Sequence, residues 1–434
     1  MNRLVILLFA VCVIYSVQGS VDKIKREASL SSRLSQETTS DVHSRARRSS
    51  RSSSYLFFDN RSGRTVQLWW RGKQWQKFIQ LGAHKTIEIN TFVSDKWRAT
   101  DVETNEVFVI NGRKKYRPKT NTRDTRAVCI IKRKGQRDTD IKAYIETLVV
   151  LDKTVRDQFD SDSEAEKYVE VLLMLSSNAY KHESLTQHGL KIDIIPSKIV
   201  ILKNEVNFDI SKRGNNLYTA CDVMNKQEKV IGSKKFDHKL FLTRNQFGAA
   251  GFSRSQAMCS RYSSCSIVFE HGFHAAYLVA HEIAHSLGLS HGDFPQYSRY
   301  IMNGFVDSLL NSHRWSTKSQ QTLLSNIRKY DYCLGNEASA ANNYPYPGEH
   351  FSFEKQCDLE FNATYTAWKP SRWEPGEPCA KLRCRMPGRW SFLTRTTGSP
   401  ALDGTECGEN KFCLLGKCQE KPAQRTASVT RRLR

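Results

Sequence analysis

The chain has 434 residues, of which 39% are hydrophobic and 25% charged, and it carries a formal net charge of +22. This length predicts about two to four domains. The charge favours acidic partners such as sulfated glycans or matrix, although a generally basic, solvated surface explains it equally well. After the N-terminus no run approaches the roughly 20 apolar residues that cross a bilayer, so the pattern excludes a membrane span.

The N-terminal residues have the pattern of a secretory leader. Met1-Asn2-Arg3 precedes an apolar run and then small residues, which predicts a signal peptide over 1–19 and a secreted, extracellular protein. Nucleic acid is therefore a poor partner. Residues 20–54 are basic and polar and predict a disordered pro-segment. Their Arg45-Ala46-Arg47-Arg48 resembles a furin-type processing site, which implies cleavage after Arg48, and the alternative is a solvated charge run.

Short β-type runs separated by Gly, Asn and Asp follow over 55–118 and predict a small β-sandwich. The order Phe58 to Ser62, Trp69-Trp70, Thr91 to Trp97 and Val107 to Val109 resembles the β-domain of the von Hippel–Lindau tumour suppressor. That resemblance implies recognition of a hydroxyproline peptide, but Asp95 stands where the family has His and Thr91 where it has Ser. A scaffold or pro-domain role is the alternative. Asn60-Arg61-Ser62 is also a glycosylation acceptor.

Residues 119–141 are basic and polar and predict a linker, which contains Cys129. Strand and helix patterns then alternate and predict an α/β domain with a mixed sheet. The expected strands are 143–151, 190–195, 198–202 and 240–242, and the expected helices are 163–181, 275–287 and 316–328.

The stretch from His281 to His291 reads H-E-x-x-H-x-x-G-x-x-H. Histidines four residues apart share one face of a helix, and a glycine helix end returns the chain so that a third histidine reaches the same ion. Three protein ligands leave an open zinc position, which is typical of a catalytic site. His281, His285 and His291 are therefore the predicted zinc ligands, with Glu282 as general base. The alternative is a buried amphipathic helix with chance histidines.

Residues 142–336 resemble the catalytic domain of the ADAMTS branch of the metzincins, because several motifs keep the family order. They include Tyr144 to Val150, Cys221, Leu242-Thr243-Arg244, Met258 to Val268 and the zinc motif. The resemblance implies a methionine turn at Met302, which is also ordinary core packing. It implies a structural calcium held by Glu146, Asp237, Asn336 and the backbone of Cys333. The family's Asp after the third histidine is displaced here by Gly292 and follows as Asp293.

Residues 345–420 resemble the disintegrin-like domain that follows the protease in ADAMTS proteins, with six cysteines where that family has eight. The family pattern implies the pairs Cys221–Cys265, Cys259–Cys333, Cys357–Cys384, Cys379–Cys413 and Cys407–Cys418. Asn362-Ala363-Thr364 is a second glycosylation acceptor, and 421–434 is a basic tail that predicts disorder.

Of the eleven cysteines after the predicted signal peptide, these five pairs leave only Cys129 without a partner. Our hypothesis is a thiolate that caps the catalytic zinc in a latent form until the chain is cut near Arg137, and the alternative is a free or intermolecular cysteine. The sequence as a whole predicts a secreted zinc endopeptidase acting on extracellular or matrix proteins. A non-catalytic binding protein is the alternative, which an intact Glu282 argues against.

Overall fold

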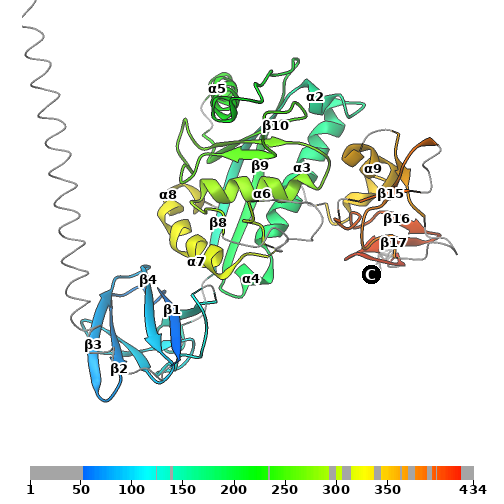
Figure 1. Ribbon diagram of the computed structural model, residues 1–434. Helices are drawn as coiled ribbons and strands as arrows, with labels where there is room; N and C mark the ends of the chain where they lie inside the picture. Colours follow the sequence, from blue (N-terminus) through cyan, green and yellow to red (C-terminus); the bar gives the residue numbers. More distant parts are fainter. Residues whose placement is uncertain are drawn as a thin grey trace, which may run out of the picture.

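The computed structural model describes residues 52–421 except 124, 137–139, 233–234, 293–299, 305–313, 337–343, 362–363, 370–376, 389–392 and 397. Figure 1 shows three bodies in chain order: a β-domain, a larger α/β domain and a small C-terminal domain. The predicted signal peptide, the Arg48 cleavage site, Asn362 and the tail beyond 421 lie outside the described residues. Within them, no helix combines the length and apolar character that a bilayer crossing requires.

The β-domain is one seven-stranded sheet wrapped around its own core. Its strands are β1 (Ser53–Asn60), β2 (Val66–Arg71), β3 (Trp75–Leu81), β4 (Thr86–Phe92), β5 (Lys96–Asp101), β6 (Val107–Ile110) and β7 (Ala127–Lys132), in the order β3-β2-β5-β6-β7-β1-β4. Alternate residues of the strands point inward, so Leu56, Phe58, Leu68, Trp97 and Phe108 fill the core. Two of these strands, β3 and β7, were not predicted.

Strand β7 corrects the prediction of a linker over 119–141. It pairs parallel with β1 and antiparallel with β6. The basic residues around it suggested a solvated segment, but Cys129 and Ile131 are fully buried in the β-domain core. A short strand that gains its stability from two neighbours needs little apolar signal of its own, because tertiary pairing overrides local composition.

Two site predictions in this domain, at Cys129 and Asn60, do not fit the fold that the structure describes. Cys129 lies in the β-domain core rather than at the zinc histidines, and burial raises the pKa of its thiol to about 12, so it cannot act there as a zinc-capping thiolate. Asn60 is fully buried, and its amide nitrogen, where a glycan would be attached, donates to the carbonyls of Arg64, Leu81 and Gly82. In this fold the Asn60 amide is therefore not accessible to a glycan.

The α/β domain is built on a five-stranded sheet of order β11-β12-β10-β8-β9. Its strands are β8 (Ile141–Leu151), β9 (Leu190–Ile201), β10 (His238–Thr243), β11 (Gly251–Ser253) and β12 (Cys265–Phe269). Strands β8, β9, β10 and β12 run parallel and β11 is antiparallel, so the sheet is mixed as predicted. The two strands predicted over 190–202 are one strand, β9, with a register shift opposite Thr147 and Leu148.

Helices cover both faces of this sheet. They are α2 (Lys153–Arg156), α3 (Asp162–Tyr180), α4 (Glu183–Thr186), α5 (Arg213–Ile231), α6 (Ala275–Ser286), α7 (Thr317–Asn326), η1 (Ile327–Tyr330) and α8 (Asp331–Leu334). The cores place α3 and α6 against one face and α5 against the other (Figure 1). The sequence reading missed α5, whose apolar residues are sparse along its exposed length.

The C-terminal domain consists of η2 (Pro347–Glu349), α9 (Phe353–Phe361) and two small sheets. The sheets contain β13 (Thr366–Ala367), β14 (Cys384–Arg385) and β15 (Thr394–Arg395), then β16 (Glu406–Gly408), β17 (Lys411–Leu414) and β18 (Lys417–Glu420). Its core is small, and a core of this size is stabilised chiefly by disulfides. The structure has the same five pairs that the resemblance implied: Cys221–Cys265, Cys259–Cys333, Cys357–Cys384, Cys379–Cys413 and Cys407–Cys418.

Candidate metal centre and catalytic site

The three predicted histidines converge on one point. The Nε2 atom of His291 lies 3.0 Å from that of His281 and 3.1 Å from that of His285. Nitrogens bound tetrahedrally at about 2.0–2.1 Å from a zinc ion would lie roughly 3.3 Å apart, so the arrangement fits zinc. The other ring nitrogens of the two helical histidines are held by carbonyls: His281 Nδ1 is 2.6 Å from Ile301 O and His285 Nδ1 is 2.7 Å from Leu289 O.

Those carbonyl contacts determine which tautomer each ring adopts. A protonated Nδ1 donates to the carbonyl and leaves a lone pair on Nε2, which is the form that binds a metal. Burial and the neighbouring histidines also lower the pKa of His281 to about 3, and burial lowers the pKa of His285 and His291. The rings are therefore neutral at physiological pH and ready to act as ligands.

Two backbone turns bring the third histidine and the methionine turn into place. Helix α6 ends at Ser286, and Gly288 adopts a φ of +95° that reverses the chain toward His291. A side chain at Gly288 would lie 2.6 Å from the amide nitrogen of Asn326, which itself donates to Leu287 O. The turn from Tyr300 to Asn303 buries Met302, and the carbonyl of Ile301 in this turn is the one that holds His281.

Glu282 is buried one residue after the first histidine. Burial raises the pKa of its carboxyl group to about 8, and Oε2 has no hydrogen-bond partner in the described part of the chain. Strand β11 passes directly over this side chain: a Cβ atom added to Gly251 would lie 2.4 Å from Glu282 Oε1. Gly251 is thus needed for the close approach of strand and carboxyl group, and nothing in the local sequence pattern indicated it.

Strand β11 is the edge of the mixed sheet and lies beside this carboxyl group. Among the strands that the structure describes, it pairs only with β12, which leaves its other side without a neighbouring strand. An extended peptide can add to such an edge through main-chain hydrogen bonds. Such a peptide would lie along β11, beside Glu282. Asp293, which follows Gly292, lies outside the described residues.

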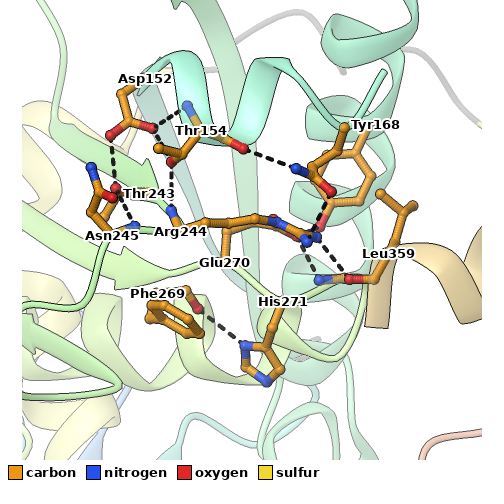
Figure 2. A network of polar contacts seen from close by, with 12 residues as sticks. Asp152, Thr154, Tyr168, Thr243, Arg244, Asn245, Phe269, Glu270, His271 and Leu359 are labelled. Carbon is orange, nitrogen blue, oxygen red and sulfur yellow. Dashed lines mark hydrogen bonds and ion pairs between the residues drawn. The ribbon is translucent and has the colours of Figure 1, made fainter. Parts of the chain in front are cut away.

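The C-terminal domain is joined to the loop that leads into the metal-binding helix. Figure 2 shows Arg244 at the centre of this contact: Nε is 2.6 Å from Glu270 Oε2, and Nη2 donates to the carbonyl of Leu359 in α9 at 2.7 Å. Tyr168 donates to the same Glu270 carboxylate. The next residue of α9, Glu360, accepts a hydrogen bond from the backbone N–H of His274 at 2.9 Å.

Glu360 reaches this position because Gly272 has no side chain. An added Cβ at Gly272 would lie 2.9 Å from both Cγ and Cδ of Glu360. His274 precedes the first turn of α6, whose own side chains provide no N-cap and no acidic residue. The C-terminal domain thus supplies a cap to the helix that carries His281 and His285, a contact that no sequence motif indicated.

The predicted calcium ligands Glu146, Asp237 and Asn336 lie close together. The Glu146 N–H donates to Asp237 Oδ2 at 2.9 Å, and the Asn336 amide donates to Glu146 Oε2 at 3.0 Å. Burial and the Glu146 charge raise the pKa of Asp237 to about 6. Carboxylate and amide oxygens are the donors that calcium prefers, so this group of residues fits the ion.

Three converging histidines, an adjacent buried glutamate and an edge strand define a metalloprotease-type site. Comparison with protein families agrees with this class: residues 143–337 match the model of the reprolysin (M12B) family of zinc metalloproteases, and residues 347–419 match the ADAMTS cysteine-rich domain 2. The chain therefore carries a reprolysin-type zinc metalloprotease domain followed by an ADAMTS-type cysteine-rich domain.

Individual proteins are also similar to this chain. The chain is 30% identical over 295 residues to human "A disintegrin and metalloproteinase with thrombospondin motifs 14", and 31% identical over 299 residues to the mouse protein of that name numbered 2. A silkworm (Bombyx mori) relative, numbered 1, is 25% identical over 300 residues. These matches cover 64–65% of this chain but only 24–28% of each relative, so the chain corresponds to about a quarter of their length.

Proposed function

We propose that this protein is a secreted zinc endopeptidase that hydrolyses peptide bonds of extracellular or matrix proteins. The observation that carries the proposal is the convergence of three neutral histidines beside a buried glutamate, under a free sheet edge that can hold an extended peptide. The disulfides support an oxidising, extracellular compartment. The family match supports the reaction class.

Each part of the site has a role in this reaction. His281, His285 and His291 would hold the zinc, which when bound supplies a Lewis acid that polarises a carbonyl and makes water easier to deprotonate. The edge of β11 would align the substrate backbone so that the scissile bond lies over the metal centre. Glu282 would take a proton from the attacking water and pass it to the departing amine.

Replacing Glu282 by alanine tests the proposal directly. We expect Glu282→Ala to lose peptide-bond hydrolysis by a factor of about a hundred or more, because Glu282 moves the proton in the proposed reaction. Its zinc content should equal that of the wild type, since the three histidines remain. Glu166→Gln, an exposed acid on α3, is the matched control. Full activity of Glu282→Ala on a protein substrate would contradict the mechanism and favour a role in binding.

We also propose that Glu146, Asp237, Asn336 and the backbone of Cys333 hold a structural calcium ion. The proximity of two carboxyl groups supports it, because without a cation they repel each other. Calcium should raise the thermal unfolding midpoint of the wild type and leave that of Glu146→Gln unchanged. An equal response of both proteins would rule out this site. Zinc should be kept saturating, so that the readout reports calcium alone.

A von Hippel–Lindau-like origin of the β-domain stays a proposal. In the structure Thr91 donates to Asp95 at 2.7 Å, so the two residues that depart from that family's binding pocket are engaged with each other. This contact favours the scaffold role over binding of hydroxyproline. A hydroxyproline peptide that bound the wild type and failed to bind Asp95→Ala would reverse that preference.

A further inference from the structure

One face of the β-domain carries a regular grid of cations and indole rings. The inward residues of β2 and β5, such as Leu68 and Ala99, belong to the core, so their neighbours in sequence point to the opposite face. The cross-strand register then places six side chains in two rows across three strands. One row is Lys77, Trp69 and Arg98, and the other is Trp75, Arg71 and Lys96. We call these six residues the tryptophan–arginine face.

Within the described part of the chain, no acid neutralises the cations of this face. Arg98 lies between two rings, 4.7 Å from the centroids of both Trp69 and Trp75, and Lys77 lies 5.7 Å above Trp69. Among the described residues, none of the four cations of the face forms an ion pair. Strands β2, β3 and β5 contain a single acid, Asp101, which is buried and bonded to backbone N–H groups of the next turn.

One pair in the grid works against the stability of the sheet. Arg71 and Lys96 are direct cross-strand partners on β2 and β5. Like charges directly opposite each other destabilise a sheet. A polyanion lying across the strands would remove this repulsion. The pair therefore favours a role of this face in binding an anion rather than in stabilising the sheet. In Figure 1, β2 and β3 lie on the side of the β-domain away from the α/β domain.

We propose that the tryptophan–arginine face binds a sulfated polysaccharide. Arginine binds tetrahedral oxyanions through paired N–H groups, and indole rings offer flat apolar surface to the C–H faces of sugar rings. Side chains two residues apart on a strand are spaced by roughly 6.5 Å and neighbouring strands by about 4.8 Å, so the grid matches closely spaced sulfates along a chain. The disulfides favour an extracellular polyanion over a nucleic acid. The face lies outside the segments that match the protease and cysteine-rich families.

The test measures binding of a short heparin oligosaccharide to the full chain at physiological salt. We expect Arg71→Ser/Lys77→Ser/Lys96→Ser to weaken binding about tenfold or more, with a shallower dependence on salt. The matched control is Lys114→Ser/Lys115→Ser/Arg117→Ser, which removes the same charge from exposed residues of the same domain. It should change the affinity by less than about threefold. Equal losses in the two triple variants would overturn the proposal.

Further measurements identify the ligand chemistry and separate a loss of binding from a loss of folding. Trp75→Ala should weaken binding without altering the salt dependence, because it removes stacking and no charge. The oligosaccharide stripped of its sulfates should bind at least about tenfold more weakly. Tighter binding of a single-stranded oligodeoxynucleotide of equal charge would overturn the polysaccharide assignment. If the triple variant shows a lowered unfolding midpoint, Lys77→Ser alone, which alters one exposed side chain, is the test. It must weaken binding measurably, and unchanged binding would overturn the proposal.

Discussion

At the scale of single residues, the site depends on close approaches that only a missing side chain allows. Gly251 lets β11 pass over Glu282, Gly272 admits Glu360, and Gly288 turns the chain from α6 toward His291. Of these, only Gly288 belongs to a sequence motif. The other two are recognisable only from the atoms that come near them, because a glycine can equally serve a turn or a bulge.

Gly251→Ala should reduce turnover and leave zinc binding intact. The added methyl group would overlap Glu282 Oε1 and displace the carboxyl group or the strand. A shift of about 1 Å in a catalytic group costs roughly a hundredfold in rate. We expect kcat/KM to fall by about ten- to a hundredfold, measured beside zinc content by atomic absorption. Unchanged kcat/KM would show that this contact has no role in positioning Glu282.

At the scale of elements, α6 is held at its start by a helix from another domain. Glu360 of α9 bonds the N–H of His274, while Arg244 binds both Glu270 and the carbonyl of Leu359 (Figure 2). Burial raises the pKa of Glu360 to about 8, and the nearby Glu270 charge adds to this effect, while Arg244 opposes it. The Nδ1 atom of His274 lies 2.8 Å from the hydroxyl oxygen of Ser399.

This contact predicts a pH-dependent stability. The folded pKa of Glu360 lies above its ordinary value of 4.5, so between pH 4.5 and about 8 the folded state binds more protons than the unfolded state. Its contribution to stability is therefore complete below pH 4.5 and declines as the pH rises toward 8. Glu360→Gln keeps the acceptor without the charge.

We expect the unfolding midpoint of Glu360→Gln to exceed that of the wild type at pH 8 and to approach it at pH 5. Glu360→Ala should lower the midpoint at both values, because the buried N–H of His274 loses its partner. Differential scanning fluorimetry over this range, with Glu349→Gln as the exposed control, decides the question. Identical pH profiles for wild type and Glu360→Gln would refute the assignment.

At the scale of the whole molecule, the β-domain is fixed to the protease domain by a buried ion pair. Arg328 in η1 donates to both carboxylate oxygens of Asp59, with Nη2 at 3.3 Å from Oδ2, and Asp59 is fully buried and also pairs with Arg61. Arg126 reaches across the same junction to Gln321 at 3.0 Å. These contacts describe a joined unit rather than two domains on a free linker.

Arg328→Gln should loosen this junction. Removing one partner of a buried pair costs about 3–5 kcal/mol, although Arg61 keeps part of the Asp59 charge paired and reduces that cost. We expect faster proteolytic cleavage between the domains and a larger radius of gyration by small-angle X-ray scattering, with hydrolytic activity on a small peptide retained. Lys329→Gln, an exposed neighbour, is the control. The same cleavage rate in wild type and Arg328→Gln would argue against docking through this pair.

Much of the protease domain was predictable because its elements carry strong local signals. The periodicity of α3 and α6 and the buried run of β8 predicted them within a few residues, whereas α5 and the edge strand β3 have weak patterns and were missed. The spacing from His281 to His291 predicted two histidines on one helix and a third on the segment after it. The three side chains converge in the structure. The burial of Cys129 and Asn60 could not be predicted, because an acceptor motif or an unpaired thiol says nothing about burial.

The sequence by itself thus determined the chemistry of the site, because metal ligation depends on residue type and helical spacing, both of which are local. The tertiary structure decided what surrounds that chemistry. It placed Gly251 against Glu282, set α9 at the start of α6 and buried Cys129 in another domain. It also aligned the tryptophan–arginine face, since cross-strand register joins residues that no spacing along the chain connects.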